Sequence, residues 1–135
     1  MELRMFTLPE KFADLFSFEK KAFAFLALVK KDGTPQVTPV WFDYDGTHIL
    51  INTARGRVKD RILKRHPKVA LAIADPNNPY RYIQIRGTVV AETEEGGYEM
   101  ICHLNQKYRG HPNYPKRPET RVTYKILPEK SSTMG

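Results

Sequence analysis

The sequence has a single cysteine among its 135 residues and no apolar run long enough to cross a membrane. Cys102 therefore has no partner within the chain for a disulfide, which fits a reducing compartment. A membrane-spanning helix needs about 20 mostly apolar residues, and no segment supplies them. The start of the chain, Met1-Glu2-Leu3-Arg4, lacks the apolar stretch of a secretory signal. We therefore expect a cytoplasmic protein with no membrane partner.

The motifs of common catalytic sites are also missing. The sequence contains no G-x-S-x-G nucleophile turn, no H-E-x-x-H zinc motif, no P-loop and no G-x-G-x-x-G dinucleotide motif. One cysteine cannot complete a typical zinc site, and the histidines are scattered without ligand spacing: His48, His66, His103 and His111. We predict no metal site and name no catalytic residue.

Composition and charge are those of one folded domain that attracts anions. Apolar residues make up 41% and charged residues 27%, and the length suits a single domain over residues 1–135. The net charge is +7, from 22 Lys and Arg against 15 Asp and Glu. Charge alone leaves nucleic acid, acidic lipid and phosphorylated small molecules open as partners. Whether the cations gather at one point or spread along several strands distinguishes these partners.

Turn signals divide the chain into six predicted strands and a few helices. The strands cover residues 22–29, 36–44, 47–53, 68–74, 80–92 and 121–127. Asp32-Gly33 and Asp45-Gly46 predict that the first three strands form an antiparallel meander, and the loop 75–79 separates the fourth from the fifth. The first strand is apolar on both faces and is expected to be buried on both. Helices are expected over residues 8–20, from 58 to about 66 and from 94 or 95 to about 109, and the tail after Pro128 is expected to fray.

This pattern indicates a mainly β protein with peripheral helices. Six strands joined by short turns favour a small closed or nearly closed antiparallel barrel. Such a short barrel with an apolar first strand gains buried surface by pairing with a second copy, so we expect a homodimer.

The densest charge lies in Asn52–Arg65, where six of fourteen residues are basic and only Asp60 is acidic. Arg57 and Arg61 are one helical turn apart, a spacing at which like charges repel by about 0.2–0.5 kcal/mol. Cations at a helix start also oppose the helix dipole. The pattern is explained if an anion lies at this helix start, held by free backbone N–H groups, Arg57 and Lys59. A solvated basic helix face is the alternative explanation.

The predicted strand 36–44 has features of a surface that binds a planar ring. Pro39 removes a backbone donor and belongs at a sheet edge, which leaves other backbone groups free to pair with a heterocycle. Gln36 and Thr38 offer polar groups on one side, and Trp41 offers a flat wall on the other. The alternative is a plain edge strand whose Trp41 belongs to the core.

The predicted strand 80–92 carries a polar face. Alternation puts four side chains on one side: Tyr80, Tyr82, Gln84 and Arg86. This face either lines a pocket, crosses a subunit interface or faces solvent.

The order of these segments resembles the pyridoxamine 5′-phosphate oxidase-like family of flavin-binding split barrels. The resemblance rests on Asp32–Trp41, Arg57–Arg61, Leu63–Pro67 and Arg86-Gly87, and it runs from about residue 25 to residue 90. Within the family, the chain is most similar to short oxidoreductases that use flavin mononucleotide (FMN) or the deazaflavin coenzyme F-420. The resemblance implies a six-stranded split β-barrel of the FMN-binding type. It also implies a homodimer with cofactors between its subunits, acting on a small-molecule substrate.

The resemblance further implies which residues bind the cofactor. Arg57 and Lys59 match the positions that hold the phosphate, with Thr53 beside them. Strand 36–41 matches the strand along the ring system, and the long strand and C-terminal part of the partner complete the groove, with Tyr82, Gln84 and Tyr108 as candidates. Hydride passes between substrate and ring without a protein acid/base pair. The predicted cofactor-binding residues are Gln36, Val37, Thr38, Pro39, Val40, Trp41, Asn52, Thr53, Arg57, Lys59, Arg61 and Gln84.

Three functions stay open at this point: a flavin or deazaflavin reductase, a non-catalytic flavin carrier, and a nucleic-acid-binding barrel. The third would stack bases on exposed tyrosines, but the cations gather at one point instead of following several strands. Vitamin B6 oxidation is not expected, because Arg121–Lys125 is a poor match for the Arg-rich C-terminal segment of the vitamin-synthesising oxidases. FMN and the deazaflavin are both candidates, and the longer deazaflavin tail could use Arg55, Lys64 or Arg65.

Overall fold

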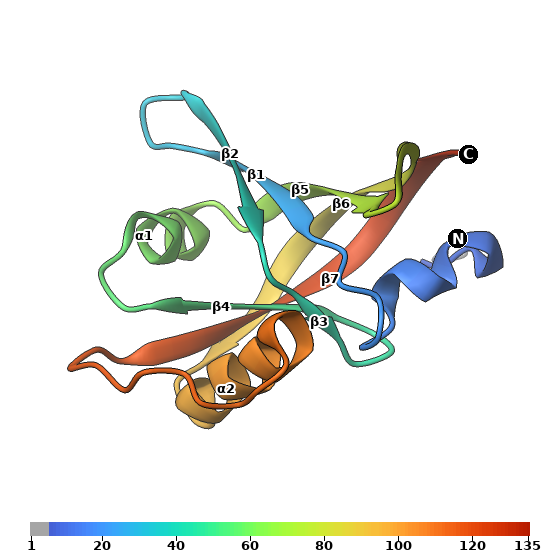
Figure 1. Cartoon of the computed structure of the whole chain (residues 1–135). Helices are drawn as coiled ribbons and strands as arrows, with labels where there is room; N and C mark the ends of the chain where they lie inside the picture. The colour runs from blue at the N-terminus through green and yellow to red at the C-terminus, as the bar shows by residue number, and fades with distance from the viewer. Residues whose placement is uncertain (1–5) are drawn as a thin grey trace.

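The computed structural model describes residues 6–135, so the expectation at Met1–Arg4 lies outside the described residues. No helix in the described part of the chain is long and apolar enough to cross a membrane. The elements are a 3-10 helix η1 (Glu10–Phe16), the strands β1 (Ala24–Val29), β2 (Pro35–Val40), β3 (Asp43–Tyr44) and β4 (Ile49–Ala54), the helix α1 (Val58–Arg65), the strands β5 (Lys68–Asp75) and β6 (Asn78–Thr93), the helix α2 (Gly97–Arg109) and the strand β7 (Arg121–Met134) (Figure 1).

The strands form one antiparallel sheet in the order β2-β1-β5-β6-β7-β4-β3. Its two edge strands, β2 and β3, are consecutive in the chain and are joined by Trp41 and Phe42 (Figure 1). The sheet therefore curls until its edges lie close together, and the chain itself bridges them. This confirms the mainly β split-barrel fold. The sheet has seven strands instead of six, because the predicted strand 36–44 breaks where it passes from one edge to the other.

The predicted three-stranded meander is wrong for the same reason. β2 pairs with β1, with Thr38 opposite Leu26, whereas β3 pairs with β4, with Asp43 opposite Leu50. β4 then pairs along its length with β7, with Asn52 opposite Thr123. Both Asp-Gly turns form hairpins as predicted, but the two hairpins lie at opposite ends of the sheet.

The core lies inside the curled sheet, and the other face of β1 is open in the single chain. Leu26 is 1% exposed, whereas its neighbour Phe25 is 44% exposed. The prediction that this strand is buried on both faces is therefore wrong for one chain. Val29 and Val37 are also exposed large hydrophobics on these two strands. The result is an apolar outer face on β1 and β2.

β7 extends further than predicted. It pairs with β6 from Thr123 as far as Met134, so the tail after Pro128 is a strand instead of a frayed end. β6 is also longer than predicted and begins at Asn78, which reduces the expected loop 75–79 to a tight turn. The register shifts near Gly87, where an added Cβ would lie 2.6 Å from the Leu127 carbonyl oxygen. The tail is polar and gives no strand pattern of its own, because it forms a strand only by pairing with β6, about 50 residues earlier in the chain.

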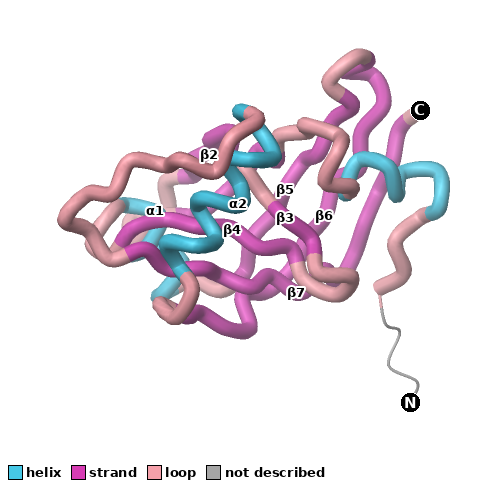
Figure 2. Tube along the Cα trace, turned by 60° about the horizontal axis from the view of Figure 1, so that its bottom comes forward, coloured by secondary structure: helices cyan, strands magenta, loops and turns pink. Residues whose placement is uncertain are grey.

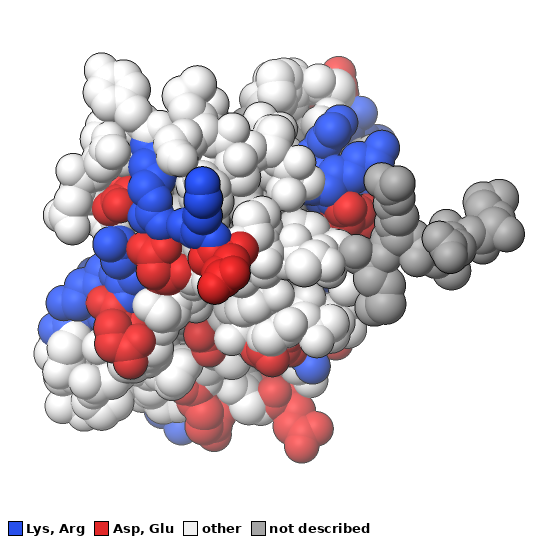
Figure 3. Space-filling view, turned by 90° about the vertical axis from the view of Figure 1, so that its right-hand side faces the viewer, with Lys and Arg blue, Asp and Glu red and all other residues white. Residues whose placement is uncertain are grey.

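η1 is shorter than the predicted helix over residues 8–20 and is held to the β5–β6 hairpin by charge. Arg81 Nη1 donates to Asp75 Oδ2 at 2.9 Å, and the same guanidinium pairs with Asp14 of η1. Its Cζ also lies 5.2 Å from the Phe12 ring centroid. Figure 3 shows this side of the molecule, where basic and acidic side chains lie next to one another. Arg81 is therefore a structural cation.

The two α-helices flank the split between the sheet edges. α1 confirms the helix predicted from residue 58 and contacts β1 and β4. α2 begins at Gly97, two or three residues later than predicted, and lies against β4 and β7 (Figure 2). An added Cβ at Gly97 would lie 2.3 Å from the Arg121 carbonyl oxygen, so glycine permits this close contact. Both helices thus approach the Trp41–Phe42 link.

Candidate functional site

Two adjoining cavities lie where β2, the end of β4, α1 and α2 come together. One has a volume of about 520 Å³ and is lined by Gln36, Thr53, Gly56, Arg57, Val58, Lys59 and Arg61. The other has a volume of about 240 Å³ and is lined by Pro39, Val40, Trp41, Asn52, Thr53, Arg57, Lys59, Ile101 and Leu104. They share Thr53, Arg57 and Lys59. Their combined size is that of a small-molecule or cofactor site, about 300–1,000 Å³.

The start of α1 forms one wall of both cavities and has no side-chain cap. Gly56 adopts a φ of +87°, which lets the chain turn sharply after β4. Arg57 is the N-cap residue and makes no capping hydrogen bond through its side chain. The first backbone N–H groups of a helix have no partner within the helix. An anion at this position would therefore meet free donors and the positive end of the helix dipole.

Asp60 anchors this helix start from the buried side. Its carboxylate is almost fully buried and accepts hydrogen bonds from the Gly56 N–H at 2.9 Å and the Tyr124 hydroxyl at 2.5 Å. Burial raises the pKa of the Asp60 carboxyl, but the hydrogen bonds from Tyr124, Gly56 and Arg55 outweigh it and hold the pKa below its ordinary value. The one acidic residue of the segment thus holds the turn and leaves the cavities to the cations.

Arg55 is bound to carboxylates of the protein itself. Its guanidinium donates to Glu94 at 2.7 Å, to Asp60 at 3.0 Å and to Glu92 at 3.3 Å. These partners raise the pKa of Arg55 further above its ordinary value. The suggestion that Arg55 serves a cofactor tail is therefore not supported by its contacts.

A polar chain connects Arg57 to β4 and β7. Arg57 Nη2 donates to Glu119 Oε1 at 2.8 Å, and Arg121 Nη1 donates to Glu119 Oε2 at 2.8 Å. Arg121 Nε donates to the Asn52 side-chain oxygen at 2.8 Å, and the Asn52 amide donates to the Gly97 carbonyl at 2.9 Å. Asn52 is consequently occupied by the protein, whereas about half of the Arg57 side chain stays exposed at 51%.

Lys59 is an unpaired cation at the position that both cavities share. Arg55 and Arg57 are ion-paired, but residues 6–135 offer no carboxylate partner to the Lys59 ammonium. Burial, and secondly the charge of Arg57, lower the pKa of Lys59 below its ordinary value. A half-buried ammonium beside another cation is more stable when an anion binds between them.

Gln36 adds a second unsatisfied group to the larger cavity. Its Oε1 atom is buried and has no hydrogen-bond partner among the residues that the structure describes. Leaving a buried acceptor unpaired costs about 1–3 kcal/mol. A ligand donor in the cavity would remove that cost.

The structure brings most of the predicted site residues together and leaves three outside. Gln36, Pro39 to Trp41, Asn52, Thr53, Arg57, Lys59 and Arg61 line the two cavities. Val37 and Thr38 belong to the same strand but do not line them, and Val37 is 64% exposed on the outer face. Gln84 lies on β6 between Ala72 and Ser132, away from the cavities of its own chain.

Some residues of the site were missed by sequence reasoning. Ile101 and Leu104 of α2 line the smaller cavity, and their three-residue spacing predicts a shared helix face but not which strand it meets. Glu119 and Arg121 are two residues apart, a spacing that places both side chains on one face of a strand. No sequence pattern near them predicts that Glu119 pairs with Arg57. Within residues 6–135 no three His, Cys, Asp or Glu side chains are grouped as metal ligands.

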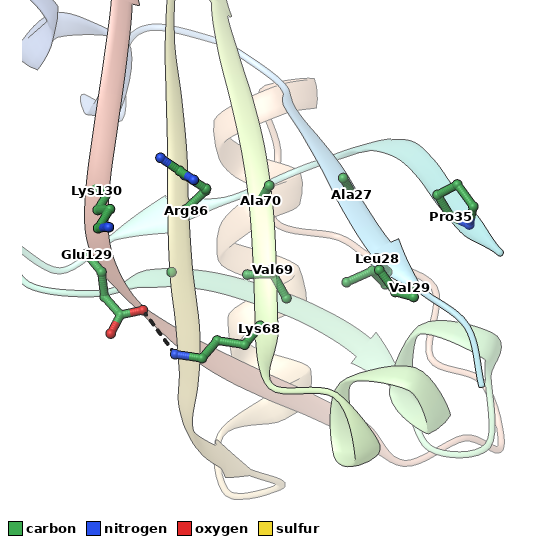
Figure 4. A pocket seen from close by; sticks show the side chains of 11 residues that line it. Ala27, Leu28, Val29, Pro35, Lys68, Val69, Ala70, Arg86, Glu129 and Lys130 are labelled. Atoms are coloured by element: carbon green, nitrogen blue, oxygen red, sulfur yellow. Dashed lines mark ion pairs between the residues drawn. The ribbon is translucent and has the colours of Figure 1, made fainter. Parts of the chain in front are cut away.

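The apolar outer face contains a separate hollow of about 500 Å³, which Figure 4 shows from close by. Ala27 and Ala70 are register neighbours on β1 and β5, and their small side chains leave this space open. Lys68 forms an ion pair with Glu129 at 3.7 Å along one side (Figure 4). Arg86 and Lys130 lie opposite each other on β6 and β7, which is an unfavourable pairing of like charges.

The family comparison matches the pyridoxamine 5′-phosphate oxidase family over residues 8–135. An F420 Reductase structure is 33% identical, with a TM-score of 0.82 over 93% of this chain and 98% of that chain. HupZ of Group A Streptococcus is 18% identical, with a TM-score of 0.67 over 94% of each chain. PhzG from Burkholderia lata 383, in complex with tetrahydrophenazine-1-carboxylic acid, is 18% identical, with a TM-score of 0.60 over 84% of this chain and 68% of that chain. A comparison with curated proteins gave no match.

Proposed function

Because the chain belongs to the pyridoxamine 5′-phosphate oxidase family, we propose that it is an oxidoreductase that holds a flavin-type cofactor by its phosphate. The observation that carries the proposal is the uncapped start of α1, where Lys59 lies half-buried without a carboxylate partner among residues 6–135. Free N–H groups, a helix dipole and an unpaired ammonium all favour the same ligand, a phosphate.

The remaining lining residues divide between the two ends of such a cofactor. Arg57, Lys59 and the Thr53 hydroxyl bind the phosphate in the larger cavity. Pro39, Val40 and Trp41 border the ring in the smaller cavity. The orphan Gln36 oxygen accepts a hydrogen bond from a hydroxyl of the chain between phosphate and ring. A bound flavin or deazaflavin supplies the hydride chemistry, and these residues bind and orient it for a small-molecule substrate.

FMN and the deazaflavin F-420 both fit this description, since each has a phosphate and a tricyclic ring. The similarity to the F420 Reductase, at 33% identity over 93% of this chain, favours the deazaflavin. Three more cations follow Lys59 along α1, and residues 6–135 give them no ion-pair partner: Arg61, Lys64 and Arg65. These cations are available to bind acidic groups of the cofactor beyond its phosphate.

We also propose that the protein is a homodimer that pairs through the apolar outer face of β1 and β2. Phe25, Val29 and Val37 expose between 44% and 64% of their surface there. A contiguous exposed apolar patch of this kind marks an interaction surface. A second copy would cover this face and could bring its Gln84, which lies on the same face, to the cofactor. Sedimentation analysis of wild-type protein and of Phe25→Lys tests the pairing; a wild-type monomer would contradict it.

Cofactor reconstitution tests the proposed function. Purified protein is titrated with FMN and with F-420, and binding is followed by absorbance and fluorescence. We expect one cofactor per chain and hydride transfer from the reduced cofactor to an artificial acceptor such as 2,6-dichlorophenolindophenol. Binding without transfer would favour a carrier. Failure to bind either cofactor, with tight salt-sensitive oligonucleotide binding instead, would favour the nucleic-acid function.

A further inference from the structure

The link between the two sheet edges leaves backbone groups that no strand can satisfy. Phe42 lies after β2 ends at Val40 and before β3 begins at Asp43. Its N–H donates to the Tyr108 hydroxyl at 3.3 Å, and its carbonyl accepts from Lys107 Nζ at 3.2 Å. Two consecutive side chains at the end of α2 thus replace the hydrogen bonds that the strand ladder gives up at the split.

Tyr108 also reaches a third part of the chain. Its hydroxyl donates to the Ala22 carbonyl at 2.6 Å, just before β1. Burial raises the pKa of Tyr108 to about 12, so the hydroxyl keeps its proton and can act as both donor and acceptor. Lys107 is 2% exposed, and its ammonium lies 4.7 Å from the Phe42 ring centroid. The end of α2 therefore holds the start of β1 and the split together.

The Trp41 indole is held by the same turn of α2. Its ring stacks on Tyr108 with centroids 5.3 Å apart and an interplanar angle of 7°. The Arg109 guanidinium carbon lies 5.1 Å from the Trp41 ring centroid. Trp41 is at the same time a wall of the smaller cavity, beside Val40 and Leu104. The orientation of that wall depends on contacts made outside the cavity.

From these contacts we infer that Tyr108 is a positioning residue that sets the Trp41 wall of the ring cavity. Tyr108 does not line the cavity. It acts through Trp41, by stacking on the indole and by fixing the backbone of the next residue, Phe42. The inference rests on the proposed function, because it assigns the wall to the ring end of the cofactor. A ring bound in this cavity is then placed by α2, while its phosphate is placed by α1.

Trp41 is the only tryptophan in the chain, so tryptophan fluorescence reports on this wall alone. Tyr108→Phe keeps the stacking ring and removes both hydrogen bonds, and Tyr108→Leu removes the stack as well. In both cofactor-free variants we expect the Trp41 emission to shift to the red and acrylamide to quench it more strongly than in wild type. Both effects should be larger in Tyr108→Leu than in Tyr108→Phe. FMN and F-420 should bind to the Leu variant about three- to tenfold more weakly, the scale of one aromatic pair. Inorganic phosphate should compete with the cofactor equally in all variants.

Tyr98→Phe is the matched control, since Tyr98 lies at the other end of α2 and its hydroxyl donates to the Tyr114 carbonyl at 2.7 Å. It should leave emission, quenching and cofactor affinity unchanged. If the Leu variant does not fold, the Phe variant carries the test. Unchanged Trp41 emission and unchanged affinity in a folded variant would overturn the inference. A wild-type protein that binds neither cofactor would overturn the proposed function instead, while the cofactor-free emission still reports on Trp41.

Discussion

The Tyr124 hydroxyl donates a hydrogen bond to the Asp60 carboxylate over 2.5 Å, so a residue of the last strand holds the first turn of α1. The same carboxylate accepts from Arg55 at 3.0 Å. Asp60 is 3% exposed, and its charge is therefore stable only while these donors remain. The start of α1 consequently depends on a buried contact that lies outside both cavities.

Replacing Asp60 by alanine should strongly destabilise the fold. The buried Tyr124 hydroxyl, the Gly56 N–H and one Arg55 N–H lose their acceptor. Because each unpaired buried group costs about 1–3 kcal/mol, we expect a loss of about 3–5 kcal/mol. Urea unfolding followed by circular dichroism measures the loss. Glu95→Ala is the control, since this exposed carboxylate has no ion-pair partner among residues 6–135 and its loss should change the free energy of unfolding by less than about 0.5 kcal/mol. Similar small losses in both variants would contradict the anchoring role.

Asp60 should also make the free energy of unfolding depend on pH in the acidic range. Its folded-state pKa lies below the ordinary value of 3.8, so the charged carboxylate stabilises the fold at pH values above 3.8. This contribution is lost as the pH falls from 3.8 through the folded-state pKa. The difference in unfolding free energy between wild type and Asp60→Asn should therefore shrink in that window. A constant difference over the same window would show that Asp60 does not titrate with unfolding.

Cofactor affinity should fall at high pH through Lys59. Burial and the charge of Arg57 lower the pKa of this ammonium below 10.5, so it loses its charge at a lower pH than a free lysine. The dissociation constant of FMN, measured from about pH 7 to about pH 10, should rise toward the alkaline end. Lys59→Arg keeps its charge over this range and should bind with little pH dependence. Parallel pH profiles in both proteins would exclude Lys59 from the phosphate contact.

Glu119 should weaken phosphate binding, because it neutralises Arg57 through a 2.8 Å ion pair. Glu119→Gln frees the guanidinium, and an exposed pair of this kind is worth about 0.2–1 kcal/mol. FMN affinity should therefore increase by a factor of about 1.4 to 5. Isothermal calorimetry at fixed ionic strength measures the change. Glu10→Gln makes the same charge change on η1 and should have no effect; an equal gain there would indicate a general effect of net charge.

Much of the site was predictable because its main features are local. Gly56, Arg57 and Lys59 are adjacent in sequence, and a basic helix start after a glycine turn indicates an anion site whatever the rest of the fold does. The strand from Gln36 to Val40 was recognisable by its proline and its alternation. What these patterns could not reveal were contacts across the chain. Arg57 meets Glu119, and Trp41 meets Tyr108, only after the sheet has curled.

The errors about the strands have the same origin. Residues 36–44 read as one strand, but they cross between the two edges of the sheet, and the break follows from which strands lie beside β2 and β3. The tail after Pro128 is polar, yet it pairs with β6 because that strand is long enough to receive it. Periodicity in the sequence reports which side of a strand is apolar, not which neighbour it has.

Local chemistry was thus enough to establish a mainly β chain, the turns, the helix after Gly56 and a concentrated basic site. Register, barrel closure and the groups that neutralise Arg55 and Arg57 depended on the packed chain. The reason is physical: backbone conformation and helix-end electrostatics act over a few residues, whereas hydrogen-bond partners and burial are shared between segments far apart in sequence. The basic helix start around Lys59 follows from one short segment, whereas Trp41 meets Tyr108 only because α2 packs beside the link between β2 and β3.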